Sequence, residues 1–253
     1  MRTIAVVNQK GGSGKTTTAV NLAAALAELG RRVLLIDLDP QASASSWLGI
    51  GDGGRGLLDV LTDNGNLADI TDETDITDLE AIPASMWLVG AEKALAGEVG
   101  AELILRREIG KLPASRWDYL LMDCPPSLGI LTVNALAAAE EVLIPVEAHV
   151  MALSGLAQLL QTIEVVRERL NPQLRVGGIL PCRVDSRTRH AKEIVQALRE
   201  RFDAQVYATI IRENVRLAEA PSFAQPITAY DPHSPGAQDY RDAAREMVAQ
   251  ETG

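Results

Sequence analysis

A chain of 253 residues, 47% of them hydrophobic and 23% charged, is long enough to bury a full core and has the composition of a globular protein. Aromatic residues make up only 4%, which argues against a stacking platform for single-stranded nucleic acid. The net charge of −10 is unevenly distributed, since residues 51–100 carry −9 whereas residues 160–220 carry +3, so a local basic surface is compatible with an acidic chain.

The first element in chain order is an apolar run after Met1, about four residues long and therefore too short for a signal peptide. No stretch approaches the roughly 18 apolar residues of a membrane span. The two cysteines, Cys124 and Cys182, stand far apart with no Cys-x-x-Cys spacing. This pattern argues against a disulfide framework or a zinc site, and we expect a cytoplasmic protein without a membrane anchor.

Short aliphatic runs alternate with helical patterns along the rest of the chain. The runs predict strands at residues 3–8, 33–37, 86–89, 118–123, 141–146, 175–181 and 205–210. The patterns predict helices at residues 15–29, 100–112, 129–139, 151–170, 188–202 and 235–250, and the acidic stretch at 59–80 predicts a loop or a short helical excursion. Strands that are apolar on both faces are typical of a parallel sheet covered on two sides. We therefore predict an α/β fold, a doubly wound and mostly parallel sheet with helices on both faces, in a single domain spanning residues 1–253.

The first predicted strand leads into the run Lys10-Gly-Gly-Ser-Gly-Lys-Thr-Thr17, which opens the first predicted helix. Glycines let successive backbone N–H groups turn inward around a phosphate, and a helix N-terminus adds positive potential. Lys15 is expected to reach the β- and γ-phosphate oxygens of ATP, and the Thr16 hydroxyl to bind Mg²⁺. The sequence therefore predicts a P-loop NTPase whose cofactors are ATP and Mg²⁺. The predicted nucleotide contacts in this run are Lys10, Gly11, Gly12, Ser13, Gly14, Lys15, Thr16 and Thr17.

This loop departs from the usual spacing G-x-x-x-x-G-K-[ST], because Gln9 stands where the first glycine is required and Lys10 follows it. The run Lys-Gly-Gly-x-Gly-Lys-Thr-Thr resembles the deviant Walker A motif of the ParA/MinD family of ATPases. In that family the lysine matching Lys10 crosses a nucleotide-sandwich dimer and contacts the phosphates of the partner. The resemblance therefore implies a homodimer in the ATP state, and a solvated loop lysine is the alternative interpretation of Lys10.

Three aspartates follow predicted strands. Asp37 and Asp39, in Asp37-Leu-Asp-Pro-Gln41, are spaced i, i+2 and lean the same way at a strand end, where ligands bind in such sheets. Asp123 ends another apolar strand, as in a Walker B motif, and would hold a Mg²⁺-bound water. The resemblance implies that Asp37 acts on Mg²⁺ through a water and that Asp39 positions or activates the attacking water. A solvated turn and a buried structural aspartate are the alternatives.

The segments 180–190 and 210–222 resemble ParA/Soj-type sequences, in which residues matching Arg187 and Arg216 contact DNA phosphates without sequence preference. Such contacts release counterions, so binding would fall steeply with salt. Asn214 keeps the position of an adenine-side contact, whereas Glu213 stands where the family has a basic residue. Arginines on solvated helix ends are common, so a purely structural role for Arg187 and Arg216 remains the alternative.

The resemblance covers nearly the whole chain and is weakest at residues 50–100. It implies a short ParA/Soj-type ATPase, without an N-terminal helix-turn-helix domain, that is weakly active alone and is stimulated by a ParB-like partner. ATP would drive dimerisation and nonspecific binding to double-stranded DNA, and hydrolysis would cause release, in chromosome or plasmid segregation. The alternatives are the same mechanism acting on a protein assembly and a MinD-like membrane cycle. The short, Ala-rich and non-basic C-terminus argues against the membrane cycle.

Overall fold

The computed structural model of this chain describes residues 1–62, 65–113, 115–149 and 152–251, and the side chains of 152–154 are not described. Within these residues a seven-stranded sheet has the order β3-β4-β2-β5-β1-β6-β7. Neighbouring strands run parallel except β3 against β4. The strands are β1 (Arg2–Val6), β2 (Val33–Asp37), β3 (Asp72–Glu73), β4 (Leu79–Ile82), β5 (Tyr119–Asp123), β6 (Glu141–Glu147) and β7 (Arg175–Cys182).

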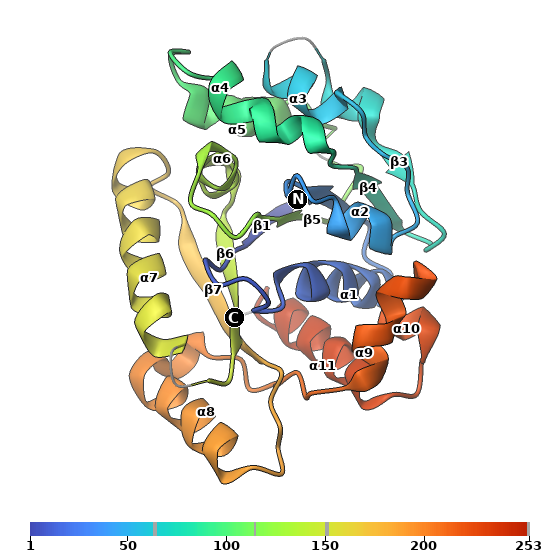
Figure 1. Cartoon of the computed structure of the whole chain (residues 1–253), viewed down its shortest axis with the longest axis vertical. Helices are drawn as coiled ribbons and strands as arrows, with labels where there is room; N and C mark the ends of the chain where they lie inside the picture. Colours follow the sequence, from blue (N-terminus) through green and yellow to red (C-terminus); the bar gives the residue numbers. More distant parts are fainter. Residues whose placement is uncertain (63–64, 114, 150–151, 252–253) are drawn as a thin grey trace.

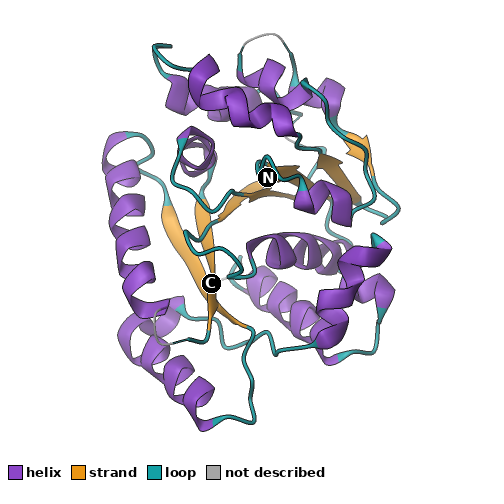
Figure 2. Cartoon of the chain, viewed as in Figure 1, coloured by secondary structure: helices purple, strands orange, loops and turns teal. Residues whose placement is uncertain are grey.

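Helices cover both faces of this sheet (Figures 1 and 2). One face packs against α1 (Lys15–Glu28), α2 (Ser43–Trp47), α9 (Val215–Glu219), α10 (Ile227–Tyr230) and α11 (Pro235–Ala249). The other packs against α3 (Gly56–Leu61), α4 (Ala91–Ala94), α5 (Ile104–Ile109), α6 (Ile130–Ala138), α7 (Ala152–Arg169) and α8 (Arg189–Phe202). Short 3₁₀ helices are η1 (Leu67–Ile70), η2 (Met86–Gly90), η3 (Ala101–Leu103), η4 (Asp203–Gln205) and η5 (Ala220–Phe223). The doubly wound, mostly parallel α/β fold is confirmed.

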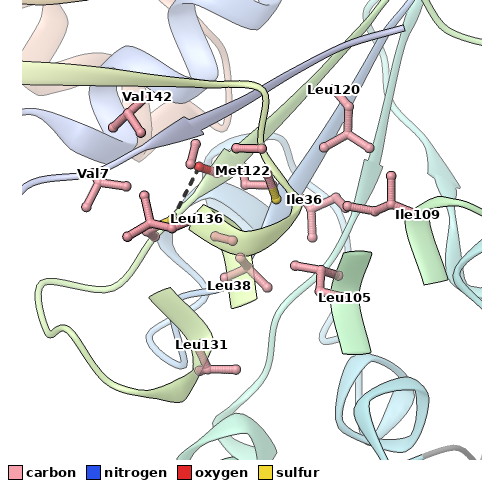
Figure 3. Packing of buried hydrophobic residues seen from close by; sticks show 14 of the residues in the cluster. Val7, Ile36, Leu38, Leu105, Ile109, Leu120, Met122, Leu131, Leu136 and Val142 are labelled. Atoms are coloured by element: carbon pink, nitrogen blue, oxygen red, sulfur yellow. Dashed lines mark hydrogen bonds between the residues drawn. The ribbon is translucent and has the colours of Figure 1, made fainter. Parts of the chain in front are cut away.

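Alternation along each strand separates two hydrophobic cores. In β1 the side chains of Ile4 and Val6 join the core under α1, whereas Ala5 joins the core on the opposite face. Figure 3 shows this second core, in which Ile36 of β2 lies toward Ile109 of α5. Because both faces of each central strand are buried, the strands have to be apolar throughout, which is the pattern that the sequence carries.

The predicted strand at residues 86–89 is wrong, and the edge of the sheet lies elsewhere. Residues Met86–Gly90 form η2, in which Trp87 N–H donates to the Ser85 hydroxyl at 3.3 Å and only Leu88 is buried. The strand beside β2 is instead β4, which lies at the end of the acidic stretch that was expected to be a loop or short helix. The apolar run was misleading because its side chains are largely solvent-exposed, whereas Leu79 and Ile82 are buried in the sheet.

The predicted strand at residues 205–210 is also wrong. This segment has one isolated bridge, between Val206 and Ile179. The Tyr207 N–H donates to the Ile179 carbonyl at 2.9 Å, but the N–H groups of Ala208 and Thr209 donate to the carboxylate of Glu246 in α11 at 2.6 and 2.9 Å. A side chain therefore takes the donors that a sheet ladder would need. The predicted helix at 151–170 corresponds to α7, and residue 151 lies outside the described residues.

The packing of Tyr207 on β7 leads to a stability prediction. A Cβ atom at Gly178 would overlap the buried Tyr207 ring. Gly178→Ala is therefore expected to lower the free energy of unfolding by about 1–3 kcal/mol through overpacking. Gly155→Ala in α7 is the matched control, because nothing lies within 4 Å of its added Cβ, and it is expected to stabilise the helix by about 0.5–1 kcal/mol. Urea titration of both variants measures this, and equal stabilities would contradict the packing.

Candidate active site

Two aspartates lie side by side at the carboxyl ends of adjacent central strands. Asp37 of β2 is the register partner of Asp123 of β5, and Asp123 is in turn aligned with Val6 at the end of β1. Alternation places both carboxylates on the sheet face that α1 covers, together with Leu35 and Leu121. The strand order therefore brings the two acids next to the loop that leaves β1.

The Asp37 carboxylate accepts hydrogen bonds from Ser45 and Asp39. Its Oδ2 accepts hydrogen bonds from the Ser45 backbone N–H at 2.9 Å and from the Ser45 hydroxyl at 2.7 Å. Its Oδ1 accepts the Asp39 N–H at 3.1 Å. Burial nevertheless raises the pKa of Asp37 to about 6, because these hydrogen bonds only partly offset the loss of water.

Asp123 is fully buried, and neither of its carboxylate oxygens has a hydrogen-bond partner. The Thr16 hydroxyl lies near this carboxylate and acts to lower its pKa. Burial, and then the neighbouring Asp37, raise the pKa of Asp123 well above its usual range, although Lys15 acts in the opposite direction. A buried carboxylate without partners is costly, and a cation beside Asp123 would lower that cost.

The phosphate-loop geometry at the start of α1 is present. Gly12 and Gly14 have φ of 74° and 91°, the left-handed region that glycine adopts without strain, and α1 begins directly after Gly14. Lys15 is largely buried, and its ammonium donates to the Lys10 carbonyl oxygen at 3.3 Å. Burial lowers the pKa of Lys15, while Asp123 and Asp39 act in the opposite direction. The loop is thus a glycine turn around a buried cation.

The Lys10 side chain is 46% exposed, and it forms an ion pair. Its ammonium donates to Glu147 Oε2 at 2.6 Å, and the Arg183 guanidinium lies 3.3 Å from Glu147 Oε1. The hydrogen bond from Lys10 holds the pKa of Glu147 below its ordinary value. Two cations beside the phosphate loop therefore share one carboxylate at the end of β6.

A cavity of about 540 Å³ lies beside the phosphate loop. Its walls include the phosphate loop, Asp39, Arg183 and the segment from Ile211 to Asn214. Asn214 caps α9, since its Oδ1 accepts the Arg216 N–H at 2.9 Å, and its Nδ2 is left buried without a partner. The volume lies within the range of small-molecule sites. The phosphate loop and Asn214, the candidate contact for the adenine base, are far apart in sequence and line the same cavity.

The two candidate DNA-binding arginines stand outside this cavity lining. Arg187 precedes α8 and pairs with Asp185 at 2.9 Å, whereas Arg216 in α9 pairs with Glu219 at 2.8 Å. Both side chains are more than half exposed. Figure 1 places the acidic segment 51–100 at the end of the molecule opposite α8, so the negative charge is kept away from Arg187.

The sequence did not point to Ser45 or Glu147. Ser45 lies eight residues after Asp37 in the short helix α2, and no motif marks it. Glu147 could have been found once β6 was placed beside β1. It ends β6, so its carboxylate lies near the loop that follows β1. Arg183 likewise ends up at this edge, directly after β7.

The residues fit a Mg²⁺ ion that is bound together with a phosphate ligand. Among the described residues no group of three or more His, Cys, Asp or Glu side chains could hold a metal by itself. Mg²⁺ usually takes one or two carboxylates and completes its shell with waters and phosphate oxygens. The unpartnered Asp123, the adjacent Asp37 and the Thr16 hydroxyl supply such a partial set.

In the described part of the chain, no helix combines the length and the apolar character that crossing a membrane requires.

The buried carboxyl of Asp123 leads to a pH prediction. Its folded pKa lies above the usual value near 3.9, so the folded state holds a proton that the unfolded state has released, and stability falls as pH rises from about 4. Asp123→Asn removes this titration. The variant's melting temperature, measured without nucleotide, should exceed that of the wild type at pH 8, and the gap should narrow toward pH 4.

Asp118→Asn provides a control of opposite sign. Hydrogen bonds from Arg32 lower the pKa of Asp118 to about 2, so its contribution is present above about pH 4 and is lost as pH falls toward 2. This variant should therefore be less stable than the wild type at pH 8. A gap between wild type and Asp123→Asn that is independent of pH would contradict the account of the Asp123 carboxyl.

Comparison with known proteins places the site in context. An AAA domain family model matches residues 1–176. The chain is 46% identical over 248 residues to the sporulation initiation inhibitor protein Soj of Bacillus subtilis, covering 97% of this chain and 98% of that protein. It is 49% identical over 249 residues to the chromosome-partitioning ATPase Soj of Thermus thermophilus, covering 98% and 96%.

Among solved structures, cobyrinic acid a,c-diamide synthase from Mycobacterium smegmatis with bound ADP and magnesium superposes with a TM-score of 0.87 at 35% identity. The match covers 100% of this chain and 96% of that one. The phosphate loop, the paired strand-end aspartates and full-length identities of 46% and 49% agree. The chain belongs to the ParA/Soj family of P-loop ATPases.

Proposed function

We propose that this protein is an ATP-dependent partitioning ATPase that binds ATP and Mg²⁺ in the cavity beside the phosphate loop. One observation carries the proposal. In the described structure, the buried side-chain polar atoms without a partner belong to Gln9, Ser13, Asp123 and Asn214, which lie in the loop or beside the cavity. Folded proteins rarely leave such groups unsatisfied, so their clustering supports a polar ligand bound at this place.

The ligand contacts divide by chemistry. Backbone N–H groups of residues 11–17 and the Lys15 ammonium would bind the phosphates, and the Asn214 amide would donate to the base. Thr16, Asp37 and Asp123 would hold Mg²⁺, directly or through water. When bound, Mg²⁺ supplies neutralisation of phosphate charge. The relative that was solved with ADP and magnesium supports this pairing of ligands.

Hydrolysis is proposed to depend on Asp39. This carboxylate lines the cavity and is only partly buried, so it can accept a hydrogen bond from a water molecule beside the phosphates. Its Oδ1 already accepts the Gln41 N–H at 3.0 Å, which fixes its direction. We propose that turnover is slow in the isolated chain and is stimulated by a ParB-like partner.

The ATP state is proposed to be a homodimer with nucleotide between two copies of the domain at residues 1–253. Lys10 is the candidate trans contact, and in the single chain Glu147 holds it. Closing the dimer therefore requires an exchange, in which the ammonium leaves a carboxylate for the partner's phosphates. Phosphate oxygens are strong acceptors for such a cation, so bound ATP favours the exchange.

The output is proposed to be sequence-independent binding to double-stranded DNA through Arg187 and Arg216, in the cytoplasm and on the nucleoid. The exposure of both side chains and the separation of α8 from the acidic segment support it. DNA phosphates would have to compete with Asp185 and Glu219 for these guanidinium groups. Relatives named chromosome-partitioning proteins support a chromosome as cargo, and a plasmid is the other cargo that we propose.

Other outputs have weaker support. A protein assembly as cargo uses the same site and differs only in the partner. A membrane cycle would need a basic amphipathic terminal helix, whereas α11 has alternating charge and packs its buried face against α1. Diamide synthesis, the activity in the name of the Mycobacterium smegmatis relative, has no specific support here, and the identity to that relative is lower than to the Soj proteins.

Substitutions at Lys15 and Asp39 should separate binding from hydrolysis. Lys15→Ala should lose ATP binding, because it removes the cation of the phosphate loop. Asp39→Ala should still bind ATP and dimerise but hydrolyse it at least about tenfold more slowly. Equilibrium binding and single-turnover hydrolysis measure the two effects, and normal turnover by Asp39→Ala would refute its role.

Substitution of Lys10 tests the dimer. Lys10→Ala should remain monomeric with Mg-ATP at concentrations where the wild type dimerises, as measured by light scattering after size separation. Lys93→Ala, which changes an exposed lysine in α4, is the matched control and should dimerise normally. Dimerisation of Lys10→Ala at wild-type concentrations would show that this lysine is not a trans contact.

A mobility-shift assay on random-sequence duplex DNA tests the output. Binding should require ATP and fall with salt. Arg187→Ala or Arg216→Ala should weaken binding and reduce the slope of log affinity against log salt concentration by about one. Arg55→Ala, which removes an exposed ion-paired arginine from the acidic end, should bind as the wild type does. Binding to anionic liposomes in place of DNA would support the membrane cycle instead.

A further inference from the structure

Arg183 occupies an unusual position at the edge of the nucleotide cavity. It lies directly after β7 and lines the cavity, although neither the phosphate-loop motif nor the strand-end acids point to it. Its side chain is 56% exposed, so the guanidinium is not committed to the core. The one ion pair that it makes with a described residue is with Glu147, at 3.3 Å.

The backbone holds Arg183 in a strained conformation. Its φ is 51°, in the left-handed region that a residue with a side chain rarely adopts. Hydrogen bonds on both sides fix it there, since Ile211 N–H donates to the Pro181 carbonyl at 2.8 Å and Val184 N–H donates to the Ile211 carbonyl at 3.0 Å. Such strain persists only where surrounding structure determines it, and it is common at functional sites.

The neighbours of Arg183 connect it to the phosphate loop. The preceding residue, Cys182, packs beneath the loop, because a Cβ at Gly14 would lie 3.7 Å from the Cys182 Cβ. The carboxylate that holds Arg183 also holds Lys10 at 2.6 Å. A single negative charge thus restrains two cations at the rim of the site, and nucleotide phosphates carry more negative charge than Glu147 alone.

Resting on the proposed ATP binding, we propose that Arg183 is a phosphate-contacting residue of the same site: its guanidinium leaves Glu147 and binds the phosphate chain of the nucleotide. Arginine suits this role because its planar fork binds phosphate oxygens in pairs. The other arginine of the cavity lining, Arg212, is not available, because its guanidinium is bound to the buried carboxylate of Asp239 at 2.6 Å. Glu147 then acts as the holding group of the nucleotide-free state.

The test measures equilibrium affinity for a non-hydrolysable ATP analogue with Mg²⁺. Arg183→Gln should weaken binding about 10- to 100-fold, the range for loss of hydrogen bonds to a charged group, and Arg183→Lys should restore part of the loss. Arg183→Gly should weaken it equally without a cost in stability, because glycine adopts the left-handed backbone freely. Arg167→Gln, which changes an ion-paired arginine exposed on α7, should bind as the wild type does.

Glu147→Gln separates a direct contact from an indirect one. If Arg183 binds phosphate, releasing it from Glu147 should leave affinity unchanged or higher. Wild-type affinity in Arg183→Gln and Arg183→Gly would overturn the proposal, and so would a loss in Glu147→Gln as large as that in Arg183→Gln. Lys15→Ala shows which of the two proposals is wrong. If Lys15→Ala loses ATP-analogue binding while the Arg183 variants keep it, only the role of Arg183 is wrong. If Lys15→Ala also binds normally, the proposed ATP site is wrong.

Discussion

The site depends on two carboxylates that the sheet forces together. Asp37 and Asp123 are register partners on adjacent parallel strands, buried on the face that α1 covers. Ser45 donates two hydrogen bonds to the Asp37 carboxylate, whereas no described group makes a hydrogen bond to the Asp123 carboxylate. Such a pair is costly while both groups are charged, and burial together with the neighbouring Asp37 raises the pKa of Asp123. A divalent cation beside the two carboxylates would offset this cost, and we propose that this is how the fold is linked to nucleotide binding.

A second electrostatic arrangement surrounds the first. Lys15 is buried beneath the phosphate loop, while Lys10 and Arg183 share Glu147 at the rim. The inner lysine is therefore held in place, which suits its proposed contact with the nucleotide of its own chain. The two rim cations pair with one partly buried carboxylate, that of Glu147, and their own side chains are about half exposed, which suits groups that move when nucleotide arrives. The difference between the two kinds of cation is one of burial, and it gives each a different proposed role.

Sequence patterns predicted the central part of this molecule well and its periphery less well. The phosphate loop and the acids at 37, 39 and 123 were predictable because glycine spacing and strand-end position impose local constraints. The strand at 86–89 was wrong because an apolar run does not show whether a neighbouring strand covers it, and β4 lay at the end of an acidic stretch. The strand predicted at residues 205–210 was wrong because the carboxylate of Glu246, distant in sequence, accepts the N–H groups of Ala208 and Thr209. Ser45 and Arg183 depend on tertiary contacts in the same way, so no local pattern marks them.

The central claim is that a Mg²⁺-nucleotide complex bound beside Asp123 would lower the raised pKa of its carboxyl, so that any proton held there is released to solvent. Calorimetric titration of the protein with Mg²⁺ and a non-hydrolysable ATP analogue at pH 7, in two buffers with different ionisation enthalpies, measures protons exchanged on binding. The account predicts net proton release by the wild type and much less by Asp123→Asn. Equal binding heats in the two buffers for the wild type would show that no proton leaves, and would contradict it.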